Sequence, residues 1–156
     1  MSIAEKKIYW WGSTLKDLRT LPEGARADIG YGLRMAQEGK KAPSAKPLTG
    51  LKEFKGSKVL EIVSTAEGDA YRGVYTVEFD EAIYLIDAFQ KKSKAGIATP
   101  KADIDRIVGR IKDVRDWRRT ADGKASIEWL NEDRKARQAI FDLQEEQEKV
   151  NALKGK

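Results

Sequence analysis

The chain has 156 residues and a net charge of +5, and it contains neither cysteine nor histidine. This length suits one domain with room for an appendage. Without cysteine there are no disulfides and no thiolate chemistry, and without histidine the usual general base and commonest metal ligand are missing. We therefore expect no metal site and no cofactor. No stretch is long and apolar enough for a membrane span or a signal peptide, so we expect a cytoplasmic protein.

The charges are unevenly distributed along the chain. Residues 40–58 carry six lysines against one glutamate, and residues 91–119 carry ten lysines and arginines against four aspartates. Between them, residues 59–90 carry seven acidic residues and a single cation, Arg72. Two basic blocks that flank an acidic one indicate a polyanionic partner, with nucleic acid the first candidate. Solvation of a small domain by lysine-rich loops explains the composition equally well.

Two helices are predicted in the first 40 residues. The first covers residues 13–21, from the N-cap candidate Ser13 to the stop at Pro22. The second runs from about Pro22 to Glu38 before the C-cap candidate Gly39, although Gly30 and Gly32 each weaken it by about 1 kcal/mol. Its apolar stripe consists of Ala25, Ile29, Leu33 and Ala36. Residues 39–57 are rich in Gly, Pro and Lys and predict a loop with short extended pieces.

Three strands are predicted next, over residues 58–64, 71–77 and 82–89. Their short connections favour antiparallel hairpins that form a meander. The third run is apolar at both odd and even positions, which is typical of a strand covered on both faces. Lys91 shares its parity with Phe89 and Asp87, so all three would point to one face if the strand continued.

Two further helices are predicted after the strands. Pro100 opens a helix over residues 101–117, with Ile104, Ile107 or Val108, Ile111, and Val114 or Arg115 facing the sheet, and with Arg106, Arg110, Lys112 and Arg118 on its polar face. After a loop at 119–124, residues 126–154 predict another helix with a short heptad seam of Ala136, Ile140, Leu143, Gln147 and Val150. This last helix either folds back onto the domain or binds a partner or a second copy.

Cations gather where the predicted strands begin and end. Lys46, Lys91, Lys92 and Lys94 would surround one sheet face together with Arg72. Taken singly, Arg72 is better explained by an ion pair with an acid such as Glu61 or Asp87 than by a phosphate contact. If the ligand is RNA, cleavage without metal needs attack of the 2′-OH on the adjacent phosphate. The planar guanidinium of an arginine can then stabilise the pentacovalent phosphorane intermediate. Neighbouring cations also lower the pKa values of lysines. Glu61, Tyr71 or Tyr75 could share the proton transfer, and Phe89 or Tyr84 could stack on a base.

Four motifs in series resemble a known family. They are "KPLTGL", "EI" on a strand, "YRGVY", and a strand ending in "FQKKS" that is followed by Pro and a helix. Over residues 8–118 the chain resembles the HigB-like, phage-related branch of the RelE/ParE superfamily of toxins from type II toxin–antitoxin systems. The resemblance implies an α+β fold: a RelE-like small twisted antiparallel sheet with an N-terminal helical hairpin and C-terminal helices. It also implies a toxin domain over residues 1–119, leaving residues 120–156 as a charged helical extension.

The resemblance further implies a metal-independent mRNA endoribonuclease that acts on the ribosome and pairs with a helix-turn-helix antitoxin. It assigns catalysis to Arg72, Lys91, Lys92 and Glu61, and places Lys46 beside the site. From the residues themselves we expect Phe89, Lys94 and Arg110 to bind RNA together with Lys46. Where most relatives have an arginine after the "EI" motif, this chain has Val63. Two other functions stay open: a ParE-like toxin that poisons a topoisomerase, and a degenerate prophage protein that binds RNA and antitoxin without cleaving RNA.

Overall fold

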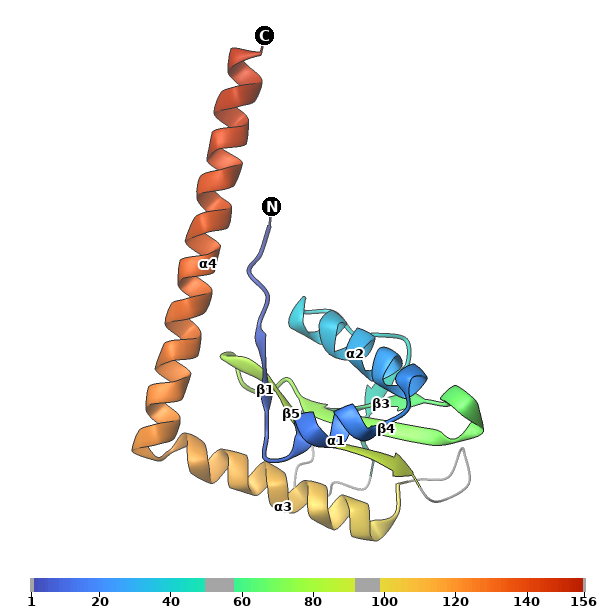
Figure 1. Cartoon of the computed structure of the whole chain (residues 1–156). Helices are drawn as coiled ribbons and strands as arrows, with labels where there is room; N and C mark the ends of the chain where they lie inside the picture. Colours follow the sequence, from blue (N-terminus) through green and yellow to red (C-terminus); the bar gives the residue numbers. More distant parts are fainter. Residues whose placement is uncertain (1, 50–57, 92–98, 156) are drawn as a thin grey trace.

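The computed structural model describes residues 2–49, 58–91 and 99–155 (Figure 1). Within these residues, four α-helices and five strands build the fold. In chain order these are β1 (Lys7–Trp10), α1 (Thr14–Thr20), α2 (Glu23–Gln37), β2 (Ala45–Pro47), β3 (Val59–Ser64), β4 (Ala70–Thr76), β5 (Ala82–Lys91), α3 (Lys101–Arg118) and α4 (Ala121–Lys154).

The strands form one sheet in the order β1-β5-β4-β3-β2. Strands β2 to β5 make an antiparallel meander, whereas β1 runs parallel to β5 at the sheet edge. Helices α1 and α2 cover one face of the sheet and α3 covers the other (Figure 1). The chain therefore has the expected α+β fold, and β5 lies between two layers of helices.

Most predicted elements are confirmed, with two differences. Strand β1 was not predicted, because four residues at a sheet edge carry no periodic signal of their own and depend on pairing with β5, where Ile8 lies opposite Ile83. Helix α4 begins at Ala121, so the predicted loop at 119–124 is wrong. The Thr120 hydroxyl accepts a hydrogen bond from the Gly123 amide at 3.0 Å and starts the helix almost directly after α3.

Helix α2 packs tightly on the sheet despite its two glycines. Ile29 and Leu33 are fully buried in the core between α2 and the strands, and burial of such side chains contributes about 1.5–3 kcal/mol each. A Cβ at Gly32 would lie 2.6 Å from Ile62 Cδ1. The glycine that lowers helix propensity is thus the residue that lets the helix approach β3.

Helix α3 packs on the opposite face through the predicted stripe. Ile104, Ile107, Ile111 and Val114 are all buried there. They contact the side of the sheet that carries Val74, Tyr84 and Ile86. The prediction of a sheet-facing stripe is confirmed, and the alternatives Val108 and Arg115 lie at its margin.

Helix α4 meets the end of α3 and then projects away from the sheet (Figure 1). A Cβ at Gly123 would lie 1.9 Å from the Trp117 carbonyl oxygen, so the close junction of the two helices requires glycine. The N-terminal segment lies beside α4: the Ala4 amide donates to Gln138 Oε1 at 2.8 Å. No helix in the described part of the chain combines the length and the apolar character needed to cross a membrane.

Candidate active site

The sheet face toward α3 carries a cluster of charged side chains beyond the apolar core. Directly paired residues on neighbouring strands share a face, and side chains two residues apart on one strand do so as well. Lys46 on β2 pairs with Glu61 on β3. Val63, two residues further along β3, pairs with Arg72 on β4, which in turn lies opposite Phe89 on β5. Lys91 follows two residues after Phe89, so four strands contribute to one site.

The Glu61 carboxylate is the centre of this cluster. Its Oε1 atom lies 3.0 Å from Arg72 Nη1 and 3.7 Å from Lys46 Nζ, and its Oε2 atom accepts a hydrogen bond of 3.3 Å from the Thr99 hydroxyl. The side chains of Glu61 and Arg72 are buried, whereas that of Lys46 is 60% exposed. The expected ion pair of Arg72 is therefore confirmed with Glu61.

Arg72 and Lys91 keep unused hydrogen-bonding capacity inside the protein. Within the described residues, Lys91 Nζ and Arg72 Nε are buried and make no hydrogen bond. Arg72 Nη1 also lacks an aligned hydrogen bond, so charge attraction rather than directed bonding accounts for its 3.0 Å contact with Glu61. A buried cation without a partner is costly, and an incoming anion would remove that cost.

The environment shifts the proton affinity of Lys91. Burial lowers the pKa of its ammonium group below the ordinary 10.5, and the positive charges of Arg72 and Lys46 lower it further, while Glu61 opposes the shift. Three cations thus share one carboxylate, which leaves the cluster with net positive charge. Such a site can bind a phosphate and can supply an amine that exchanges protons more readily than a free lysine.

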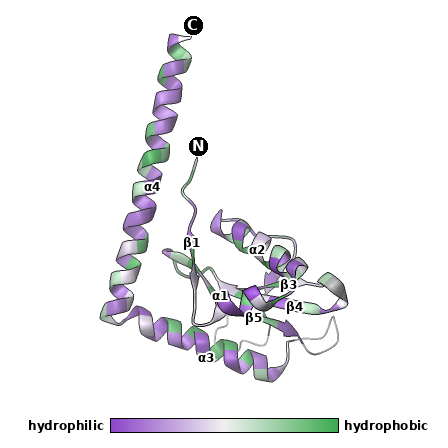
Figure 2. Ribbon diagram, in the orientation of Figure 1, coloured by the Kyte–Doolittle hydropathy of each residue, from purple (hydrophilic) through white to green (hydrophobic). Residues whose placement is uncertain are grey.

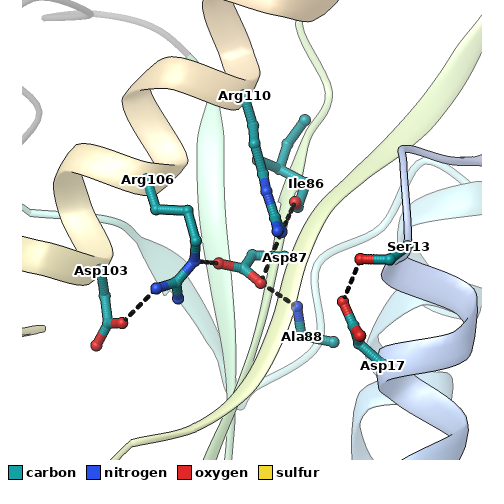
Figure 3. A network of polar contacts seen from close by, with 8 residues as sticks. All are labelled: Ser13, Asp17, Ile86, Asp87, Ala88, Asp103, Arg106 and Arg110. Atoms are coloured by element: carbon teal, nitrogen blue, oxygen red, sulfur yellow. Dashed lines mark hydrogen bonds and ion pairs between the residues drawn. The ribbon is translucent and has the colours of Figure 1, made fainter.

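A second network joins α3 to β5 beside this cluster (Figure 3). Asp87 Oδ2 lies 2.7 Å from Arg106 Nε, and Asp87 Oδ1 accepts from Arg110 Nη1 at 2.9 Å. Arg110 also donates to the Ile86 carbonyl at 3.0 Å, and Arg106 Nη1 lies 2.9 Å from Asp103 Oδ1. The network borders a groove of about 560 Å³ between α1, β5 and the start of α3. Arg110 therefore links α3 to the sheet, and it belongs to a different network from that of Arg72.

Comparison with known proteins gives the family. The profile of the family described as Phage derived protein Gp49-like (DUF891) matches residues 16–112. The chain belongs to this family. It is a family of RelE/HigB-type toxins, so the resemblance to the RelE/ParE superfamily is confirmed and the chain is assigned to the toxins of toxin–antitoxin systems. Toxins of this kind pair with antitoxins.

Two further comparisons complete this result. The solved structure of E. coli toxin RelE, an arginine-to-alanine double mutant in the free state, is 19% identical to the Gp49-like chain, with a TM-score of 0.49. The similarity covers 69% of this chain and 98% of that chain. No curated protein matches the chain.

The Gp49-like match spans the described site from Lys46 to Lys91 and ends before α4. Of the predicted site residues, the structure brings together Glu61, Arg72, Lys91 and the more exposed Lys46. Lys92 and Lys94 lie outside the described residues. No sequence pattern distinguishes Thr99, because a hydroxyl residue before a helix-opening proline looks like any other loop residue.

Phe89 stands between the two networks of the Gp49-like chain. Its half-buried ring packs with the core under α3, and the guanidinium of Arg106 lies 5.1 Å from the ring centroid. One face of the ring is therefore already covered by a cation. Among residues 2–49, 58–91 and 99–155, no group of three or more carboxylates gathers to hold a metal ion.

Proposed function

We propose that this Gp49-like protein is a metal-independent endoribonuclease that cleaves mRNA on the ribosome as the toxin of its toxin–antitoxin pair. The observation that carries the proposal is the buried ammonium group of Lys91, unpartnered within the described residues, beside the partly unsatisfied guanidinium of Arg72. Both groups line one sheet face with Glu61 and Lys46. A phosphodiester is the ligand whose charge and acceptors such a face would satisfy.

In this mechanism the scissile phosphate takes the place of Glu61 as the acceptor for Arg72. The 2′-oxygen of the RNA attacks the adjacent phosphorus and gives its proton to a base, for which Glu61 and the neutral amine of Lys91 are the candidates. Arg72 and Lys46 stabilise the additional negative charge of the phosphorane. The P–O5′ bond then breaks, and the leaving 5′-oxygen takes a proton from the ammonium group of Lys91, which forms in the first step where Lys91 is the base. The products are a 2′,3′-cyclic phosphate and a 5′-hydroxyl.

The test uses purified protein and message, with and without ribosomes, and chemical analysis of both product ends. We expect 2′,3′-cyclic phosphate and 5′-hydroxyl ends, and no cleavage where the reacting ribose is replaced by 2′-deoxyribose. Arg72→Ala should lower the rate about 100- to 1,000-fold, as loss of a preorganised charge-stabilising group does. Arg19→Ala removes an exposed arginine on α1 and is the matched control. Ends with a 3′-hydroxyl and a 5′-phosphate would contradict the mechanism.

The partner that we propose for neutralising this activity is a helix-turn-helix antitoxin. Support comes from the resemblance to HigB-like toxins and from the pairing of RelE-like toxins with antitoxins. Co-expression of a helix-turn-helix antitoxin of this kind should restore growth, and the antitoxin should co-purify with the chain. Normal growth of cells that express the chain at full level without an antitoxin would contradict a toxin function.

A further inference from the structure

The second half of β5 is a sheet edge that no other strand of the described chain covers. Strand β1 pairs with β5 only from Ala82 to Leu85, and the Trp11 amide donates to the Leu85 carbonyl at 3.2 Å where this pairing ends. The chain then turns into α1, so β5 continues to Lys91 with β4 alone beside it. Along β5 the residues change from hydrophobic to hydrophilic toward this bare end (Figure 2). A bare edge offers unpaired backbone N–H and C=O groups to a ligand.

The backbone groups of Ala88 and Gln90 point outward at this edge. The Ala88 amide donates to Asp87 Oδ1 at 2.9 Å and not to β4, and the direction of such groups alternates from residue to residue along a strand. Arg110 Nη1 occupies the neighbouring Ile86 carbonyl at 3.0 Å. The Ala88 carbonyl and the Gln90 amide remain as an acceptor and a donor side by side, without a hydrogen bond to the described residues. This row is too short for an added peptide strand, but it suits a small planar ligand.

Ala88 and Gln90 line the groove of about 560 Å³ between α1, β5 and the start of α3. Figure 3 shows α3 and α1 on the two sides of β5 at this point. Three carboxylates and two guanidinium groups also line the groove, from Asp17, Asp87, Asp103, Arg106 and Arg110. Both guanidinium groups are already bound to Asp87. The described lining therefore has no unpaired cation for a phosphate, and its net negative charge favours a neutral ligand that donates hydrogen bonds.

We propose that this groove binds one nucleobase of the RNA through its Watson–Crick edge. The inference rests on the proposed function, because the groove adjoins the charged cluster. Gln90 directly precedes Lys91, and Phe89, which also lines the groove, lies opposite Arg72. Neighbouring strands lie about 5 Å apart, so a nucleotide whose phosphate contacts Arg72 can reach the edge of β5 with its base. Single-stranded RNA is commonly recognised through hydrogen bonds to bases that are turned out in this way.

Guanine matches the groups of this groove. Its Watson–Crick edge presents two donors, the N1–H and the 2-amino group, and one acceptor, O6. The Ala88 carbonyl accepts from N1–H, and the Gln90 amide donates to O6. Asp17, whose carboxylate lies beside Ala88 in Figure 3, accepts from the 2-amino group. Its Oδ2 atom already accepts from the Ser13 hydroxyl at 2.8 Å, whereas Oδ1 has no partner among the described residues. Adenine, cytosine and uracil each present only one donor group on this edge.

Arg106 offers a flat surface on which the base stacks. Its guanidinium lies 5.1 Å from the centroid of the Phe89 ring, and its side chain is 37% exposed. The contacts with Asp87 at 2.7 Å and with Asp103 at 2.9 Å hold its plane in position. RNA bases commonly stack on arginine planes as well as on aromatic rings. The groove therefore provides both the edge contacts and the stacking contact that a base needs.

Binding of RNA that cannot be cleaved tests the groove separately from the nuclease activity. The probe is a short fluorescent oligouridine that is 2′-O-methylated at every ribose, which blocks attack by the 2′-oxygen. One central uracil is replaced by guanine, adenine, cytosine or hypoxanthine, and affinity is measured by fluorescence anisotropy with the full chain. The guanine probe should bind about 5- to 100-fold more tightly than the others. Hypoxanthine, which differs from guanine only by the missing 2-amino group, reports on Asp17 alone.

Two pairs of variants locate the effect. Asp17→Ala should remove the difference between guanine and hypoxanthine, whereas Glu23→Ala, which removes an exposed carboxylate from the first turn of α2, should keep it. Gln90→Pro removes the outward N–H, a change that edge strands tolerate, and should weaken binding of the guanine probe about fivefold or more. Gln90→Ala keeps the N–H and should bind as wild type does.

The outcomes separate the groove from the nuclease. Equal affinity of the wild type for the guanine and hypoxanthine probes would overturn the groove assignment, and so would a difference that survives Asp17→Ala. Equal affinity for all the bases would leave the edge to a polypeptide strand. A guanine preference without cleavage of unmodified RNA would contradict the nuclease proposal and support the groove. Cleavage without that preference would have the reverse meaning.

Discussion

Replacing Lys91 by methionine should stabilise the protein while abolishing its activity. Lys91 is 3% exposed, and its ammonium group is buried, makes no hydrogen bond within the described residues and lies near the cations Arg72 and Lys46. Methionine keeps a similar length and flexibility and removes the cost of burying an unpartnered polar group, which is about 1–3 kcal/mol. Because Glu61 compensates part of that cost, we expect a gain of about 1–2 kcal/mol. For a chain of this size the melting temperature should rise by about 2–8 °C.

The assay is thermal and urea unfolding of wild type, Lys91→Met and a matched control. Lys101→Met makes the same substitution at a lysine whose side chain is 89% exposed, and it should change stability by less than about 0.5 kcal/mol. A lower melting temperature for Lys91→Met than for wild type would contradict this prediction. It would mean that the native protein provides hydrogen-bond or charge partners for the Lys91 ammonium group and is stabilised by them.

The stabilisation should also depend on pH. The pKa of Lys91 is lowered on folding, so between the folded pKa and 10.5 the unfolded chain binds more protons than the folded chain. Stability of the wild type therefore rises with pH in that window, as the buried ammonium loses its proton. The advantage of Lys91→Met should be full at pH values below the folded pKa of Lys91 and should shrink as the pH rises towards 10.5. An advantage that grows with pH would contradict the assigned direction of the shift.

Three further outcomes follow from individual contacts. Asp87→Ala removes the acceptor shared by two arginines of α3, and should lower the free energy of unfolding by about 2–4 kcal/mol in urea titrations. Gly123→Ala places a methyl group against the Trp117 carbonyl and should cost about 1–3 kcal/mol by the same measurement. Val63→Arg adds a guanidinium opposite Arg72, so RNA should bind more tightly. The slope of log affinity against log salt concentration should become steeper by about 0.7–0.9.

The charged cluster was largely predictable from the sequence because strand periodicity is strict. Once β3, β4 and β5 are placed in a meander, alternation alone puts Glu61, Arg72 and Lys91 on one face. Strand β5 does continue to Lys91, and this strand carries the lysine into the site. The partners of the carboxylate were less predictable, since Thr99 precedes a helix and its contact with Glu61 follows from no strand or helix periodicity.

Other features depend on tertiary contacts that no local pattern encodes. The arginines of α3 occupy the polar side of a periodic helix, and this pattern is typical of arginines that face solvent. Arg110 instead binds Asp87 at the margin of the packed face, and the pattern does not distinguish it from the others. Strand β1 is stable only because β5 offers it a free edge. The early start of α4 follows from the N-cap Thr120 and from Gly123, which stand in a segment whose composition is typical of a loop.

We propose that one sheet face cleaves message at a phosphate held by Arg72. This proposal can be tested by mapping new mRNA 5′ ends after induced expression of wild type, Arg72→Ala and the exposed-site control Arg19→Ala in bacteria. We expect new ends within coding regions for wild type and Arg19→Ala, and none for Arg72→Ala that is still folded. Growth arrest without new ends would contradict it, and would make poisoning of a topoisomerase the better explanation.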